Sequence, residues 1–158
     1  MTPTRPATRL AAAVLLAGAW ALACAAGQAP VPVPPAVAAA PADSPREQAI
    51  FAVSDADPQK WSLTLGNIGN AIDGLGAGAA EIELVVYGPG IAMLRKDSPV
   101  ADRIAAAQKN GVRIVACQNS MRGFHLEQAD LAPGVGVVPS GVVELIRRQH
   151  AGYAYVRS

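Results

Sequence analysis

The chain has 158 residues, which favours one folded domain and at most two. It holds 13 Lys and Arg and 12 Asp and Glu, but residues 1–42 contain only Arg5 and Arg9 and no acid, so residues 43–158 carry 11 basic and 12 acidic groups. A nearly neutral body lacks the basic surface that binds nucleic acid, so we expect no nucleic-acid partner. Two cysteines and two distant histidines argue against a disulfide framework and against a metal site.

The first 24 residues are typical of an export signal. Arg5 and Arg9 give a positive start, and residues 10–23 form an uncharged apolar run that is too short to span a bilayer. Small residues precede Cys24, where a bacterial lipoprotein would be cut and acylated, although Ala21 stands where such signals usually have Leu. Two interpretations stay open: an ordinary secretory signal, or lipidation of Cys24 that tethers the protein to a membrane. Both predict a periplasmic or lipid-anchored protein of the bacterial envelope.

Residues 25–46 are rich in Ala, Pro and Val. Proline removes backbone donors and favours an extended polyproline-like conformation. The segment therefore predicts a semi-rigid spacer before a folded domain, the alternative being a plain disordered N-terminus.

The first part of the folded domain, residues 47–158, predicts a strand followed by an amphipathic helix. The apolar run 49–53 is the strand, and Asp55 or Asp57 is expected to cap a helix whose first residue is Pro58. Apolar residues of this helix recur at spacings of 4, 3, 4 and 3, which predicts one buried stripe. The stripe consists of Trp61, Leu65, Ile68, Ile72 and Leu75.

The rest of the domain repeats this alternation. After a second strand at 82–87, a Gly88-Pro89-Gly90 turn leads into a short helical piece at 91–94. A helix begins near Ser98-Pro99 with Val100, Ile104 and Ala107 facing inward, and a weakly helical segment covers 119–130. A last helix opens at Pro139-Ser140-Gly141. The remaining predicted strands are 112–116, which leads to Cys117, 135–138 and 153–156.

Apolar strands separated by helices indicate a three-layer α/β/α domain with a parallel sheet. In such sheets, ligands bind at the carboxyl ends of the strands. This rule selects four segments as the functional edge: 54–57, 87–90, 117–120 and 139–141.

Cys117 has the most distinctive chemistry on this edge. A thiolate near a helix N-terminus is stabilised by free backbone N–H groups, here those of Asn119 and Ser120, and Arg122 would add a positive charge. The alternative is an inert buried thiol. Gly88 and Gly90 are candidates to present backbone N–H groups to an anion, although a simple turn is the leading explanation for them.

Taken together, these segments resemble the DsrE/DsrF-like (YchN-like) family. The landmarks are the Tyr-Gly-Pro-Gly turn at 87–90 and the strand ending in Ala116-Cys117, and the resemblance covers residues 47–158. It implies a five-stranded parallel fold that assembles into homotrimers or homohexamers. It also implies a persulfide at Cys117, because several members are sulfur-relay proteins with a cysteine at that position. The apolar residues Ile91, Met93 and Leu94 are expected to lie in the interface between copies.

The leading hypothesis is an exported sulfurtransferase or sulfur carrier that needs no cofactor and exchanges sulfur with a donor and an acceptor protein through Cys117. A second hypothesis is a non-enzymatic oligomeric module of the cell envelope that binds a small anion or a protein at the same edge. A third is a purely structural trimer. Only the first hypothesis requires the Cys117 thiol.

Overall fold

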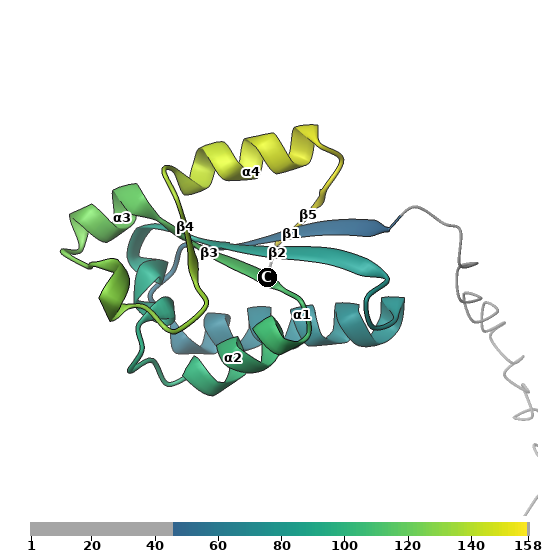
Figure 1. Cartoon of the computed structure of the whole chain (residues 1–158), viewed down its shortest axis with the longest axis horizontal. Helices are drawn as coiled ribbons and strands as arrows, with labels where there is room; N and C mark the ends of the chain where they lie inside the picture. The colour runs from purple at the N-terminus through teal and green to yellow at the C-terminus, as the bar shows by residue number, and fades with distance from the viewer. Residues whose placement is uncertain (1–45, 158) are drawn as a thin grey trace, which may run out of the picture. The chain divides into compact units, whose positions relative to one another are not determined.

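The computed structural model describes residues 46–157 (Figure 1). The predicted export signal, Cys24 and the spacer up to residue 45 lie outside the described residues. Five strands alternate with helices in the order that the sequence predicts. The elements are β1 (Glu47–Val53), α1 (Pro58–Leu75), β2 (Ala80–Val86), the 3₁₀ helix η1 (Gly88–Leu94), α2 (Ala101–Lys109), β3 (Arg113–Cys117), α3 (Gln118–Gly123), the 3₁₀ helix η2 (Gln128–Asp130), β4 (Gly136–Val138), α4 (Gly141–His150) and β5 (Ala154–Val156).

The strands form one parallel sheet in the order β4-β3-β2-β1-β5. Helices α1 and α2 lie on one side of the sheet, and α4 lies alone on the other, as Figure 1 shows. The predicted three-layer α/β/α fold with a five-stranded parallel sheet is therefore confirmed. Because successive strand residues point to opposite faces, β1 to β4 each contribute to two separate cores.

The larger core lies between the sheet and α1, α2 and η1. Trp61, Leu65 and Ile68 of the predicted helical stripe are buried in it, as are Ile104 and Ala107 of α2. The smaller core lies under α4 and contains Ile50, Val85, Val115, Val138, Leu145 and Tyr153. The one helix on this face of the sheet, α4, buries a single large apolar side chain, Leu145.

The stripe of α1 ends earlier than predicted. Ile72 is only partly buried and Leu75 is 44% exposed. An 18-residue helix is about 27 Å long. The seven-residue strand β1 spans about 23 Å. The last turn of α1 therefore extends past the strands that bury its beginning.

The expectation that Ile91, Met93 and Leu94 lie between copies of the chain is wrong. All three side chains are at most 1% exposed, because η1 turns them into the larger core of their own domain. Large exposed apolar residues lie elsewhere. They are Leu63, Leu75, Phe124, Val142, Val143, Ile146 and Tyr155.

The start of α1 follows the sequence rule closely. The Asp57 side chain accepts a hydrogen bond from the backbone N–H of Gln59 at 2.8 Å, and Pro58 is the first helical residue. Asp55 instead forms an exposed ion pair with Lys60. Over residues 46–157, no helix is both long and apolar enough to cross a membrane.

Candidate functional site at the end of β3

Cys117 lies where the connections between strands change sides of the sheet. The chain leaves β1 and β2 towards the side of α1 and α2, but it leaves β4 towards α4 (Figure 1). Cys117 is the last residue of β3, the strand next to β4. Ligands of parallel sheets bind at the carboxyl ends of the strands, and Cys117 stands at such an end.

The Cys117 side chain is on the α4 face of the sheet. It is in register with Val138, which belongs to the core under α4. Helix α4 begins directly beside it: a Cβ atom on Gly141 would lie 3.3 Å from the Cβ of Cys117 and 3.1 Å from that of Tyr87. Glycine at position 141 therefore allows the N-terminus of α4, which carries a partial positive charge, to approach the sulfur.

Ser120 connects Cys117 to the Gly-Pro-Gly turn. The backbone N–H of Gly88 donates a 2.7 Å hydrogen bond to Ser120 Oγ. Since the oxygen is the acceptor in this bond, the Ser120 hydroxyl hydrogen is available to the sulfur of Cys117. The turn and the start of α3 thus hold one donor in place for the thiolate.

Two opposing effects act on the pKa of Cys117, whose residue is 4% exposed. Burial raises the pKa, because it disfavours the charged form. Hydrogen bonding to the thiolate by the Ser120 hydroxyl and by the backbone N–H groups of Gly141, Ser120 and Asn119 lowers it. The hydrogen bonds outweigh burial, so the pKa of Cys117 lies below its usual value.

The other predicted site residues differ in what they contribute. Arg122 is exposed, and its guanidinium donates to the side-chain oxygen of Asn119 rather than adding a charge beside the sulfur. The backbone N–H of Gly90 donates to Ser54 O at 2.9 Å, so it already has a partner within the chain. Gly88 acts on Cys117 through Ser120. Ligand binding by these residues stays a prediction.

Two titratable residues near this edge, Asp57 and His125, are not in contact with Cys117 in any interaction described above. Asp57 caps α1, as one of the two alternatives predicted. His125 follows α3 in an exposed position with a φ of 53°. Among residues 46–157, no group of three or more His, Cys, Asp and Glu is arranged to hold a metal ion.

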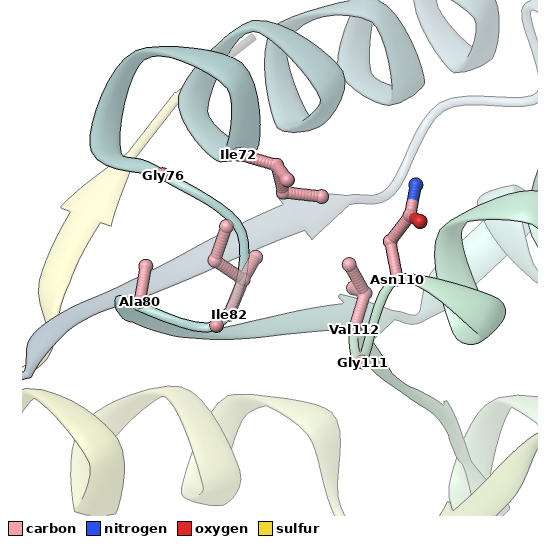
Figure 2. Close-up of a pocket in the computed structure, with 8 residues that line it drawn as sticks. Ile72, Gly76, Ala80, Ile82, Asn110, Gly111 and Val112 are labelled. Atoms are coloured by element: carbon pink, nitrogen blue, oxygen red, sulfur yellow. The ribbon is translucent and has the colours of Figure 1, made fainter.

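Two hollows of the domain lie away from Cys117. Figure 2 shows the smaller, at the opposite edge of the sheet, between the end of α1 and the turn before β3. Its volume of about 10 Å³ is the room of roughly one water molecule. A more open hollow of about 480 Å³ runs along α2 and is lined by Lys96, Ala101, Asp102, Ala105, Gln108, Lys109, Ala132 and Pro133.

Sequence reasoning identifies one functional residue only in part and misses another. It places Gly141 on the functional edge, but it does not identify the Gly141 N–H as a donor to the thiolate. Glu83, which is 1% exposed, is a charged residue buried in a central strand. The alternation of Glu81, Ile82 and Glu83 was the available signal, since it places two acids on one face of an otherwise apolar strand.

Comparison with known proteins places this fold in a family. The family described as DsrE/DsrF-like matches residues 48–157. Among solved structures, a protein of unknown function from Methanobacterium thermoautotrophicum, MTH1491, is 34% identical, with a TM-score of 0.68, over 71% of this chain and 99% of its own. The ychN protein from E. coli is 16% identical, with a TM-score of 0.58, over 71% of this chain and 99% of its own.

A third solved structure has the same fold. It is a conserved protein of unknown function from Bacteroides thetaiotaomicron, BT1422, which is 15% identical, with a TM-score of 0.59, over 71% of this chain and 95% of its own. The comparison with curated proteins found no match. The match over residues 48–157 covers well over half of the sequence, and the chain therefore belongs to the DsrE/DsrF-like family.

Proposed function

We propose that the protein carries sulfur as a persulfide on Cys117, acting as a sulfurtransferase or sulfur carrier. The observation that supports this most is the set of donors around one sulfur atom: the Ser120 hydroxyl and three backbone N–H groups lower the pKa of Cys117 despite its burial. A thiolate is the nucleophile in sulfur chemistry, and a persulfide is more acidic than a thiol, so the same donors would stabilise both anions.

The proposed reaction has two steps without net oxidation. The Cys117 thiolate attacks the outer sulfur of a donor persulfide, R–S–SH. A new S–S bond forms at Cys117, the S–S bond of the donor breaks, and the donor leaves as the thiolate R–S⁻. An acceptor thiolate then attacks the outer sulfur of the Cys117 persulfide and releases the Cys117 thiolate. No cofactor takes part in either step.

Intact mass after incubation with polysulfide, or with thiosulfate and a sulfurtransferase, tests this proposal. We expect the wild-type full chain to gain one sulfur atom on Cys117. Cys117→Ser is expected to abolish the gain and keep the fold, since the substitution removes little volume. Cys24→Ser, which alters the other cysteine of the chain, is the matched control and is expected to gain sulfur normally. Absence of any gain on Cys117 in the folded wild-type protein would exclude the carrier role.

The alternative function is a non-enzymatic envelope module that binds a small anion or a protein at this edge. The observation that favours it is the group of exposed apolar residues on α4 and β5, which suits a protein contact. Cys117→Ser distinguishes the two functions, because a binding module without thiol chemistry would retain its binding when the thiol is lost.

We also propose that the protein is exported, as its first 24 residues suggest, and that it assembles as a homotrimer or homohexamer. Fractionation and intact mass of the native protein test the location. A mature form that lacks the leader, in the periplasm or bound to a membrane through Cys24, is the expected result. A cytosolic chain that begins at Met1 would contradict export.

A further inference from the structure

A charged cluster anchors the second half of α4 to the sheet. It consists of Glu83 on β2, Arg113 on β3, and Glu144 and Arg148 on α4. Glu83 Oε1 lies 2.6 Å from Arg113 Nη1, and Glu83 Oε2 lies 2.7 Å from Arg148 Nε. The side chain of Glu83 is 2% exposed, whereas that of Arg148 is 25% exposed. The charge of Glu83 is therefore almost fully removed from water.

The members of this cluster also bind one another, and Tyr153 and Glu81 lie beside them. Arg113 and Arg148 both donate hydrogen bonds of 3.1 Å to Glu144, and the two oxygens of Glu83 form ion pairs with the same two arginines. Tyr153, which follows α4, donates to Glu81 and accepts from Arg148 at 3.1 Å. An isolated buried carboxylate is costly, so Glu83 depends on both guanidinium groups.

The cluster and the sulfur site lie under the two ends of the same helix. Gly141, the first residue of α4, is beside Cys117, and Arg148 is seven residues later, or about 10 Å along the helix. Between them, Leu145 packs in the small core with Val85 and Val115. On the sheet, Glu83 precedes Tyr87, the neighbour of Gly141, by four residues or about 13 Å.

This arrangement leaves α4 with few contacts that fix its position. Leu145 is the only large apolar side chain that the helix buries, and Val142, Val143 and Ile146 are exposed. The ion pairs with β2 and β3 therefore supply much of the attachment of α4. Since Gly141 and Arg148 belong to one continuous helix, the attachment at Arg148 can influence where Gly141 lies relative to Cys117.

We propose that Glu83 and Arg148 are positioning residues of the sulfur site, whose ion pair holds α4 where the Gly141 N–H reaches Cys117. The inference deepens the proposed function of Cys117 and rests on it. A direct charge effect would have opposite signs at the two residues, since loss of the Glu83 negative charge would lower the pKa of Cys117 and loss of the Arg148 positive charge would raise it. A positioning effect through α4 would raise the pKa of Cys117 in both variants.

The test is the pH profile of Cys117 alkylation by iodoacetamide, followed by intact mass on the full chain carrying Cys24→Ser, so that Cys117 is its one thiol. Glu83→Gln and Arg148→Gln are expected to move the midpoint upward and to slow alkylation below the midpoint roughly three- to tenfold, the effect of weakening, without losing, one hydrogen bond to the thiolate. Arg95→Gln, which removes the exposed ion pair with Asp97, is the matched control and is expected to leave the profile unchanged.

A double-mutant cycle shows whether the effect passes through Gly141. Gly141→Ala forces the start of α4 away from Cys117, so adding Glu83→Gln to it is expected to cause no further shift. In contrast, Glu83→Gln and Ser120→Ala are expected to add. Additive shifts with Gly141→Ala, or a wild-type midpoint in folded Glu83→Gln and Arg148→Gln, would overturn the proposal.

A further variant, Glu144→Gln, and a separate measurement of sulfur uptake complete the test. If Glu83→Gln does not fold, Glu144→Gln weakens the same attachment while leaving Glu83 with both arginines, and it is expected to give a smaller upward shift. Its unchanged profile would count against the proposal. Sulfur uptake by the wild type is measured separately, so shifted midpoints without sulfur uptake would disprove the carrier role and leave the positioning role standing.

Discussion

At Cys117, the hydroxyl of Ser120 is the side-chain donor among the groups that lower the pKa of the thiol. We expect Ser120→Ala to move the alkylation midpoint of Cys117 upward, with roughly ten- to a hundredfold slower alkylation below it. The variant also leaves the Gly88 N–H without its acceptor, which costs about 1–3 kcal/mol of unfolding free energy if that group stays dry. Alkylation against pH and urea unfolding measure the two effects.

Ser140→Ala is the matched control for this prediction. Ser140 lies on the same edge, directly before α4, and its side chain forms no capping hydrogen bond. Its removal is expected to change neither the midpoint nor the stability by a measurable amount. Equal effects of the two substitutions would show that the Ser120 hydroxyl has no special role.

Tyr153 carries a second pKa displacement, on the α4 side of the sheet. Burial and the hydrogen bond that it donates to Glu81 raise its pKa from 10.0 to about 12. A raised pKa contributes stability that is complete below pH 10 and is lost as the pH rises from 10 to about 12. Glu81→Gln is expected to bring the pKa back towards 10, because it replaces a charged acceptor by a neutral one. Ultraviolet absorbance of the phenolate follows the titration.

Comparison with Tyr153→Phe separates the phenol from the rest of the fold. This variant is expected to lose the fall in stability between pH 10 and 12, and its thermal midpoint should depend less on pH in that range. A Tyr153 titration that is unchanged in Glu81→Gln would contradict the assigned hydrogen bond.

Among the elements, α1 shows how local sequence rules decide where a helix begins. Asp57 and Pro58 suit the cap and the first helical position, and the structure places them there. Asp57→Ala is expected to lower the unfolding free energy by about 1 kcal/mol, since the Gln59 N–H loses its acceptor. Asp55→Ala removes only an exposed ion pair with Lys60 and is expected to cost less than about 0.5 kcal/mol. Urea unfolding of both variants measures the difference, and equal losses would contradict the cap.

The elements also show where sequence periodicity stops being informative. The spacing of Trp61, Leu65 and Ile68 predicted their burial correctly, but the same spacing continued to Leu75, which is exposed. Periodicity describes one face of a helix and contains no information about the length of the sheet below it. The short apolar runs predicted all five strands. Each strand is either buried between two layers or paired with a strand that is buried in this way.

Across the whole molecule, the position of the candidate site was predictable and its inner contacts were not. The carboxyl-end rule depends only on the parallel alternation of strands and helices, and it selected Cys117, Ser120 and Gly141 together. The Glu83 cluster was missed because it joins three elements whose relative placement is set by packing. The burial of Ile91 was missed for the same reason, since a short 3₁₀ helix gives no periodic signal.

Assembly is the prediction that belongs to the whole molecule. The family resemblance implies a homotrimer or homohexamer, and the buried residues of η1 are not available for it. Val142 and Ile146 on α4 are 52% and 49% exposed, and Tyr155 on β5 is 45% exposed. Tyr155 is in register with Ile50 of the small core, so its side chain lies on the α4 face. These three residues therefore share one side of the sheet, where a second copy would cover them.

Ile146→Glu is accordingly expected to reduce the assembled form to monomers, because it places a charge within an apolar contact. Leu63→Glu is the matched control: Leu63 is 54% exposed but belongs to α1, on the opposite side of the sheet, and the variant is expected to assemble normally. Light scattering at micromolar concentration measures both. A monomeric wild type would contradict assembly itself, and an assembled Ile146→Glu would place the contact elsewhere.

Alkylation of Cys117 in the monomeric Ile146→Glu variant shows whether assembly affects the thiol. We expect an unchanged alkylation midpoint, since every donor to that sulfur comes from the same chain.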